Sequence, residues 1–526
     1  MNGPGPKPLD LGPPTMGPAD LDAAGGLRRR VLHNAATTVA GNAWAVIVGA
    51  ISLPLVLRGI GAEAFGLWVL VQTFSALTGW LSLGDLGLRI ASVRAIAGRA
   101  ATGDRAAANR AAVTAQLLFA TIGIVIAAAM LTAGRAWLPA AFRAPAELTP
   151  HLRFAIACFA LQVAIEFTMA GTQARLEGSQ RVDLARAMHA VRQTLIAIAT
   201  TIAAVQVGTL RSVAFASAAA SSLAFVVTLV VAQRRVPLER AAPSWSDARD
   251  QFRYGLQVGM VNATGVLHRT MDRLIVGVTF GPAPVALVEI ATQIQNGVQS
   301  ILTASAYTTT ATAPWLHARS EGDRLRGLLV RGTKLSILVT LPAAAVAIVL
   351  AAPLVRAWMG PDHASAAGLT AVATIAVVMA APLQVGSLVL QGVGHVGVVL
   401  RAAIAAVVVN LLASLALVHV TGVVGVFQAT LLGSLVLAVP LTRGVLRVGE
   451  VSGHEFWRRA VAPTLLPAVA ATFGAAGGLL VGRAWPSLLL GTVLAGVAWA
   501  ATSWRCALDD DDRLHLREAI SVRRNG

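Results

Sequence analysis

Long apolar stretches alternate with short polar connectors along most of the chain, from Arg28 onward. A stretch of about 20 apolar residues is long enough to cross a bilayer as a helix. The pattern therefore predicts an all-α polytopic membrane protein with about fourteen transmembrane helices. The expected spans lie near residues 35–57, 65–86, 111–134, 153–173, 190–208, 212–232, 255–280, 284–313, 335–356, 366–390, 402–419, 423–442, 460–481 and 486–504.

Composition supports this interpretation. Apolar residues make up 56% of the 526 residues, and charged residues only 13%. The apolar share of a soluble protein is nearer to about 45–50%, even with glycine included. The balance excludes a disordered, collagen-like or coiled-coil chain and disfavours a soluble enzyme. The two cysteines, Cys158 and Cys506, are too few and too far apart for a disulfide framework or a metal site.

Basic residues are distributed unevenly between alternate connectors. With the N-terminus placed inside, Arg and Lys in the inner connectors outnumber those in the outer connectors by about five to one. If one helix had been missed, the inner and outer connectors after it would be exchanged and the bias would be lost. The bias therefore supports both the number of spans and the orientation. We therefore expect both termini in the cytoplasm.

Weak internal matches relate the two halves of the chain. An offset of 220 residues aligns Asn42 with Asn262, and an offset of 214 aligns Leu176–Gly178 with Leu390–Gly392. Both matches join one helix to the helix six further on, and such parallel repeats are related by an axis along the membrane normal. We expect two six-helix lobes related by a pseudo-two-fold axis along the membrane normal, plus two C-terminal helices.

The predicted organisation has six parts. The first segment is rich in proline and glycine and cannot bury a core, and the four aspartates 509–512 are expected to form a solvated acidic tail. The parts are a disordered cytoplasmic leader (1–27), an N-lobe with spans 1–6 (28–232), a cytoplasmic inter-lobe linker (233–254), a C-lobe with spans 7–12 (255–442), spans 13–14 (443–504) and a cytoplasmic tail (505–526).

Ionisable residues within spans are candidate functional groups, since a charge at mid-bilayer costs at least about 2.5–3.5 kcal/mol. In span 7, Asn262, Arg269 and Arg273 share one helical face. Two guanidinium groups in a cavity of low dielectric constant suit a diphosphate, and Asp272 would neutralise them when the cavity is empty. The alternative is that Arg273 reaches the outer head groups while Arg269 and Asp272 hold helices together.

Two further carboxylates lie within spans. Glu166 in span 4 and Glu289 in span 8 either relay a proton that couples transport to a gradient or only pack helices through hydrogen bonds. Gln293 and Asn296 share a face of span 8 with Glu289, which suits either a polar cavity or contacts between helices. Asn42 in span 1, aligned with Asn262, joins the candidate substrate-binding residues.

The inner end of span 2 carries a possible charge pair. Asp85 and Arg89 are four residues apart, so we expect a structural or gating ion pair. Arg94 and Arg99 follow in the next connector and are expected to set the topology instead of binding a ligand.

Several short motifs resemble those of polysaccharide (O-antigen/Wzx-type) flippases of the multidrug/oligosaccharidyl-lipid/polysaccharide exporter superfamily. The motifs are Gly61–Trp68, Asp85–Leu88, Arg94, Leu176–Gly178 and Asp272–Gly277. The resemblance runs from about residue 30 to 505. It implies a flippase of the bacterial inner (plasma) membrane that moves a polyprenyl-diphosphate-linked oligosaccharide from the inner to the outer leaflet by alternating access. It also implies membrane lipids and the polysaccharide polymerase machinery as partners.

Three other functions stay open. An ion-coupled multidrug exporter of the same superfamily would favour a carboxylate in span 1 or 7 and an anionic cavity, whereas span 1 has no carboxylate and span 7 has two arginines. A peptidoglycan lipid-precursor flippase shares the expected spans and the cationic cavity. A membrane-embedded glycosyltransferase or ligase is disfavoured by the short outer connectors.

The chain contains no nucleotide-binding motif of the GxxxxGK[ST] kind, which an ATP-driven pump would need. We therefore expect a transporter and not an enzyme, with no cofactor and no nucleic-acid partner. A gradient of H⁺ or Na⁺ is the expected source of energy.

Overall fold

We describe a computed structural model of this chain. Within its described part the chain is helical and contains no β-strand, which confirms the all-α fold. The leader 1–27, Asn42 and the side chains of Asn262 and Arg269 lie outside the described residues. The described residues are 41, 43–75, 79–85, 87–306, 309–319, 321–510 and 512–513, apart from the side chains of residues 257, 258, 260–262, 268, 269, 310, 311, 314, 315 and 318.

Eleven described helices are long and apolar enough to cross a membrane. The other expected spans correspond to α9 (Trp245–Phe280), α10 (Ala283–Ala306) and an interrupted second span. The eleven are Ala43–Ile60, Arg105–Ala141 (α4, η2 and α5), Thr149–Gly178 (α6), Val182–Gln206 (α7), Leu210–Arg235 (α8), Gly322–Val349 (α12), Ala366–Gly392 (α14), Val396–Thr421 (α15), Val424–Val448 (α16), Gly453–Val481 (α17, η4, α18 and η5) and Ala484–Ala507 (α19 and η6).

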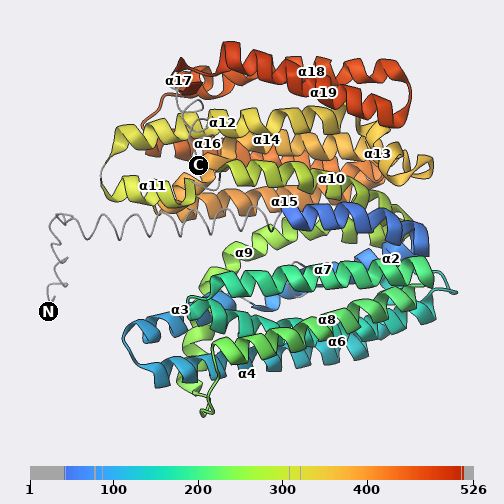
Figure 1. The fold of residues 1–526 in the computed structure, drawn as a ribbon, viewed down its shortest axis with the longest axis vertical. Helices are drawn as coiled ribbons and strands as arrows, with labels where there is room; N and C mark the ends of the chain where they lie inside the picture. The colour runs from blue at the N-terminus through green and yellow to red at the C-terminus, as the bar shows by residue number, and fades with distance from the viewer. Residues whose placement is uncertain are drawn as a thin grey trace.

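The helices form two lobes that lie side by side (Figure 1). One lobe contains α3, α4, α6, α7 and α8, and the other contains α10, α12, α14, α15 and α16. The last two long helices, α18 (Ala462–Gly478) and α19 (Ala484–Thr502), pack on α12 at the outer side of the second lobe. This arrangement confirms the two lobes and the two added C-terminal helices.

The second expected span is interrupted, so the prediction of one continuous helix over 65–86 is wrong. Helix α2 (Ala62–Gln72) ends in a turn at Thr73, and the chain resumes as η1 (Trp80–Asp85) and α3 (Leu88–Ala101). The Thr73 hydroxyl donates to the Val69 carbonyl, and the Trp80 amide donates to the Thr73 carbonyl over 2.9 Å. A Cβ at Gly79 would lie 2.2 Å from the Thr73 oxygen, so the break requires glycine there.

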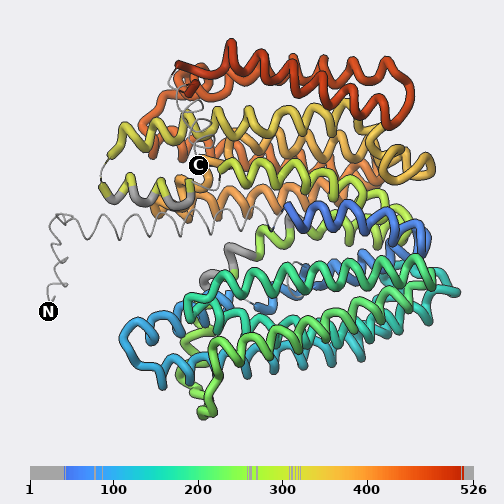
Figure 2. Tube along the Cα trace, viewed as in Figure 1, coloured from blue at the N-terminus to red at the C-terminus, as the bar shows by residue number. Residues whose placement is uncertain are grey.

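Helix α9 connects the two lobes (Figure 2). It begins at Trp245, inside the segment 233–254 that was expected to be a linker. It packs on α3, η1 and α4 of the first lobe and on α10, α15 and α16 of the second. Helix α9 therefore packs against both lobes and connects them along the chain.

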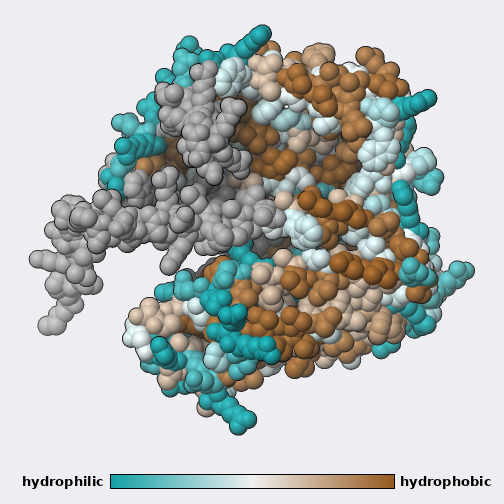
Figure 3. Space-filling view, viewed as in Figure 1, coloured by the Kyte–Doolittle hydropathy of each residue, from teal (hydrophilic) through white to brown (hydrophobic). Residues whose placement is uncertain are grey.

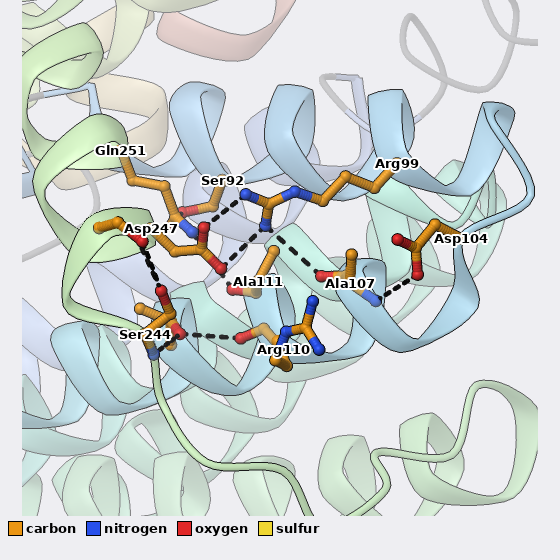
Figure 4. A network of polar contacts seen from close by, with 11 residues as sticks. Ser92, Arg99, Asp104, Ala107, Arg110, Ala111, Ser244, Asp247 and Gln251 are labelled. Carbon is orange, nitrogen blue, oxygen red and sulfur yellow. Dashed lines mark hydrogen bonds and ion pairs between the residues drawn. The ribbon is translucent and has the colours of Figure 1, made fainter.

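Polar side chains attach the beginning of α9 to the first lobe (Figure 4). Arg99 of α3 forms a bidentate pair with the buried Asp247, with distances of 2.5 and 3.0 Å. Gln251 accepts a hydrogen bond from Ser92 over 2.7 Å, and the Arg94 guanidinium lies 4.3 Å from the ring centre of Tyr254. Arg94 and Arg99, which were expected to set the topology, thus also hold α9 against the first lobe.

The lobes meet at one end of the bundle. The Trp358 indole donates to the Ala50 carbonyl over 2.6 Å, and Arg143 donates to the Thr279 carbonyl over 2.6 Å. The first bond attaches the segment before Gly360 to the first helix, and the second attaches the connector after α5 to the end of α9. We call this the arginine-poor end, with connectors 60–62, 141–149, 206–210, 280–283, 349–366, 421–424 and 481–484. The opposite, arginine-rich end carries connectors 101–105, 178–182, 235–245, 318–322, 392–396 and 448–453.

Apolar side chains cover much of the middle of both lobes, whereas polar side chains gather toward the two ends (Figure 3). Many large apolar residues are exposed on the outward faces of α4, α7, α8, α15, α18 and α19. A belt of this kind suits a lipid environment, in contrast to the small apolar patches of soluble proteins. The chain is a multi-pass membrane protein.

Candidate functional site

A cavity of about 300 Å³ lies between the lobes. Its walls come from five helices: Ala43–Ile60, α2, α7, α9 and α10. Most of the lining is apolar or weakly polar. The two charged side chains in the described lining are Arg273 of α9 and Glu289 of α10, so they dominate the electrostatics of the cavity.

Arg273 and Glu289 form an ion pair inside this cavity. The guanidinium Nε and the carboxylate Oε2 are 2.6 Å apart, and the two side chains are 18% and 19% exposed. Both residues were predicted as site residues, but the sequence did not pair them. The pair joins two helices across the cavity wall, and its partial exposure leaves room for another ligand of the guanidinium.

Among the described ion pairs, Arg273 pairs with Glu289, and Asp272 does not form the salt bridge with it that we expected. Its carboxylate accepts a hydrogen bond from Thr430 of α16 over 3.4 Å, and Thr430 in turn accepts one from Asn410 of α15 over 2.9 Å. The other oxygen, Oδ1, is buried and has no hydrogen-bond partner within the described part of the chain. Successive residues of a helix point about 100° apart, which directs Asp272 into the second lobe while Arg273 faces the cavity.

The predicted polar face of α10 lines the cavity only in part. Gln293 contributes to the wall and donates to the Val46 carbonyl over 3.4 Å. The first helix approaches closely here, since a Cβ at Gly49 would lie 2.3 Å from the Gln293 amide nitrogen. Asn296, almost one turn further along α10, is exposed. Gln293 therefore belongs to the cavity, and Asn296 is not among the residues that line it.

Glu166 lies in a separate network inside the first lobe. Its carboxylate pairs with Arg192 of α7, and the two side chains are 1% and 5% exposed. Gln162 donates to the same carboxylate over 3.0 Å and accepts from Ser217 of α8 over 2.9 Å. The network joins α6, α7 and α8. Arg192, near the start of the expected span 190–208, was not among the predicted site residues.

Asp85 and Arg89 do not form the side-chain pair that we expected. The Asp85 carboxylate accepts the backbone N–H of Arg89 over 2.9 Å, and it thereby caps the beginning of α3. The Arg89 guanidinium instead pairs with Glu177 at the end of α6, at 3.1 Å. A spacing of four residues suits a side-chain pair only within a continuous helix, and here η1 ends at Asp85.

The sequence analysis did not find Gln72, which lies at the end of α2. Its side chain lines the cavity, and its Oε1 atom is buried with no hydrogen-bond partner among the described residues. A buried acceptor of this kind requires a donor, which a polar substrate or water can supply. An uncharged amide in an apolar stretch is a weaker indication of a functional site than a charged group, because burying it costs less free energy.

Comparisons with known proteins identify the family. A profile described as "Polysaccharide biosynthesis protein" matches residues 58–367, which is more than half of the chain. The chain belongs to this polysaccharide biosynthesis family. A comparison with curated protein sequences gives no match.

Solved structures show the fold of this family member. The lipid II flippase MurJ, in an inward closed conformation, superposes with a TM-score of 0.70 over 88% of this chain and 97% of that one, at 12% identity. An inward-facing multidrug resistance MATE family transporter of the MOP superfamily gives a TM-score of 0.65 over 77% and 95%, at 19% identity. MATE in a bent conformation gives 0.55 over 80% and 96%, at 18% identity.

These comparisons confirm the predicted superfamily resemblance and the two-lobed helical fold. The fold is the one that the MurJ flippase and MATE transporter structures share. Both of the first two neighbours are named as inward conformations. In this chain the Trp358 and Arg143 hydrogen bonds lie at the arginine-poor end.

Proposed function

We propose that this chain is a flippase for a polyprenyl-diphosphate-linked oligosaccharide in the export of cell-surface polysaccharide. It moves the lipid from the inner to the outer leaflet of the bacterial inner membrane by alternating access. Both termini and the arginine-rich end face the cytoplasm in this proposal, in agreement with the uneven distribution of basic residues.

The Arg273–Glu289 pair is the observation that carries the proposal. It lies in the cavity between two lobes, where a transported group must pass. Guanidinium groups bind phosphate oxygens through paired, charge-assisted hydrogen bonds. In the structure, the Glu289 carboxylate forms an ion pair with the Arg273 guanidinium. A diphosphate replaces Glu289 on the guanidinium, and Arg269, one turn earlier on α9, supplies a second cation.

This exchange of partners also provides a route to energy coupling. When the diphosphate takes Arg273, Glu289 loses its cationic partner inside the membrane. An unpaired buried carboxylate is unfavourable unless it binds a proton or a cation. Uptake of H⁺ or Na⁺ by Glu289 would therefore accompany substrate binding. Asp272, whose Oδ1 is buried without a hydrogen-bond donor in the described structure, is the second carboxylate available for this role.

The lobe contacts support alternating access with α9 as the link. The start of α9 is fastened to the first lobe through Arg99 and Asp247. Its C-terminal half carries Arg273, which pairs with α10 of the second lobe. Relative rotation of the lobes would therefore change the surroundings of Arg273, which is what a binding site must undergo when it opens to the other leaflet.

The deciding experiment compares cells with and without this gene. Polyprenyl-diphosphate-linked saccharides are extracted, and their leaflet is determined with an impermeant glycan-binding probe on spheroplasts. We expect the deletion strain to accumulate these lipids in the inner leaflet. Wild-type protein should restore their export, whereas the double substitution Arg269→Ala/Arg273→Ala should not. Arg401→Ala, an exposed arginine that bonds only within its own helix in the described structure, is the matched control.

Other outcomes would redirect the proposal. Unchanged saccharide lipids together with increased drug sensitivity would favour the multidrug exporter. Accumulation of the peptidoglycan precursor would favour that flippase function, which the fold shared with MurJ also supports. Normal export by the double variant would remove the diphosphate role from these arginines.

A further inference from the structure

A second and larger cavity lies in the second lobe, toward the arginine-rich end. Its volume is about 1280 Å³, and it is bounded by α12, α17 (Gly453–Phe456), η4 (Trp457–Val461) and Asp509 of the C-terminal tail. It shares no lining residue with the Arg273 cavity. Three of its lining residues are acidic and six are basic. The basic residues are Arg324, Arg326, Arg331, Lys334, Arg458 and Arg459.

Lys334 is the deepest of these cations. It is 2% exposed, although a buried ammonium is strongly unfavourable unless it has a counterion. The counterions come from the tail, about 175 residues later. Asp512 lies 2.5 Å and Asp509 2.9 Å from the Lys334 Nζ. The prediction of a solvated acidic tail is therefore wrong for Asp512, which is buried against a cation far away in the sequence, whereas Asp509 and Asp510 are exposed as expected.

The two aspartates are placed differently. Asp512 is 7% exposed, whereas Asp509 is 74% exposed at the cavity wall. Asp510, between them, is 97% exposed and pairs with Arg513 instead. The tail therefore buries the Asp512 carboxylate beside Lys334 and leaves the Asp509 carboxylate at the surface. A counterion that lies mostly in solvent can be exchanged for another anion at a lower cost than one held inside a lobe.

Three of the lining arginines have one acidic partner among them in the described part of the chain. Arg326 and Arg459 share one carboxylate, that of Glu455. Arg458 is exposed and has neither an ion pair nor a hydrogen bond within the described part of the chain. Guanidinium and ammonium groups that converge in this way suit phosphate oxygens, which accept several charge-assisted hydrogen bonds.

We propose that this cavity binds a phosphate-bearing anion, and that Asp509 and Asp512 compete with that anion for Lys334 as built-in counterions. Binding of the anion releases the tail from Lys334, and return of the tail displaces the anion. The inference goes beyond the proposed transport function, because it assigns a second binding site and a competing segment of the chain itself. The anion is either a lipid headgroup or a soluble phosphate compound, and the chemistry of recognition is the same for both.

Binding to the purified full-length protein tests this proposal without a transport assay. One arm titrates inorganic pyrophosphate into detergent-solubilised protein by calorimetry. The other arm measures binding of phosphatidylglycerol by native mass spectrometry, with phosphatidylcholine, whose zwitterionic headgroup has no net charge, as the comparison. We expect Asp509→Asn/Asp512→Asn to bind one of these probes about tenfold more tightly than the wild type, a coupling of the usual size between competing ligands.

The chain offers matched controls. Asp510→Asn removes a neighbouring charge that does not contact Lys334, so its affinity should equal that of the wild type. Lys334→Met in the Asp509→Asn/Asp512→Asn background should cancel the gain. Where the double variant does not fold, Asp509→Asn alone serves, because Asp512 still pairs with Lys334, and it should show part of the gain. Arg273→Ala should leave binding unchanged, which separates this site from the proposed function.

The outcomes are distinct. Tighter pyrophosphate binding by the double variant supports a soluble ligand, and tighter phosphatidylglycerol binding supports a lipid headgroup. Absence of binding to both probes by the wild type and the double variant would overturn the site. If Asp510→Asn gained as much affinity as the double variant, the proposed competition by the tail would be overturned. The same would follow if the triple variant that carries Lys334→Met bound as tightly as the double variant.

Discussion

The Glu166–Arg192 and Arg273–Glu289 pairs differ in burial and in place. The Glu166–Arg192 pair is enclosed by three helices of one lobe, with Gln162 and Ser217 satisfying further hydrogen bonds around it. The Arg273–Glu289 pair is partly exposed in the cavity between the lobes. The residue types are the same, so composition alone does not distinguish the two roles.

The difference shows how location decides what an intramembrane charge does. A pair enclosed in one lobe keeps its partners when the lobes move, because Glu166, Arg192, Gln162 and Ser217 all belong to helices of that lobe. A pair on a cavity wall is able to exchange its partner for a ligand. We therefore assign helix packing to the enclosed pair and substrate binding with coupling to the cavity pair. The following substitutions test that comparison.

The largest expected effect comes from Arg192→Met. It leaves Glu166 buried without its cation, and breaking a buried pair in this way destabilises a protein by about 3–5 kcal/mol. We expect low abundance in the membrane and a lowered unfolding temperature of the purified protein. The double variant Glu166→Gln/Arg192→Met should recover most of the loss. Wild-type stability in the single variant would contradict the packing role.

Arg273→Ala should affect transport more than stability. The cavity pair is partly exposed, so the protein should remain abundant, while export of the lipid-linked saccharide falls about ten- to hundredfold through loss of charged hydrogen bonds. The leaflet assay measures the effect, with membrane abundance determined in parallel. Arg273→Lys keeps the charge but loses the paired donors, so an intermediate rate is expected. If Arg273→Ala lowered membrane abundance as much as export, Arg273 would have a structural role like that of Arg192.

Glu289→Gln should change the response to an imposed gradient. An amide cannot take up a proton, so export in spheroplasts should become insensitive to the pH gradient if Glu289 is the coupling group. The comparison variant is Glu166→Gln, which should retain the gradient response because Glu166 is enclosed with Arg192. The sequence left both carboxylates open for proton relay. A response that is lost in Glu166→Gln and kept in Glu289→Gln would reverse our assignment.

Gly49→Ala is expected to have the smallest effect. The new Cβ would lie 2.3 Å from the Gln293 amide nitrogen, so that flexible side chain must move out of the cavity wall. We expect a two- to fivefold loss of export, which corresponds to about 0.4–1 kcal/mol, and unchanged abundance. Gly297→Ala is the control, since its Cβ would have a nearest neighbour at 3.8 Å. Equal effects of both would show that the Gln293 position is unimportant.

The helices were more predictable than their interruptions. Apolar length alone located the long spans, because each membrane helix must satisfy its own backbone hydrogen bonds. The break after Gln72 was missed, since its cause is a group of small residues whose carbonyls and hydroxyls bond locally. Such local competition barely changes the average hydropathy of a segment.

The candidate site was predictable as a set of residues but not as a set of contacts. Arg273, Glu289 and Gln293 were selected because polar groups in apolar stretches are costly, and the structure brings them to one cavity. Asp272 and Glu166 were selected for the same reason, yet they lie in separate clusters. Gln72 and Lys334 were missed as site residues, because an amide and a cation near a span end look ordinary in a linear pattern.

The sequence by itself determined the fold class, the positions of most long helices and the uneven placement of positive charge. These are local properties, since hydropathy and charge act on each helix separately in the bilayer. Only the tertiary structure decided which charges meet: Arg273 with Glu289, Glu166 with Arg192, and Lys334 with the distant tail. Ion pairs depend on distances of a few ångströms between helices, and no linear pattern contains those distances.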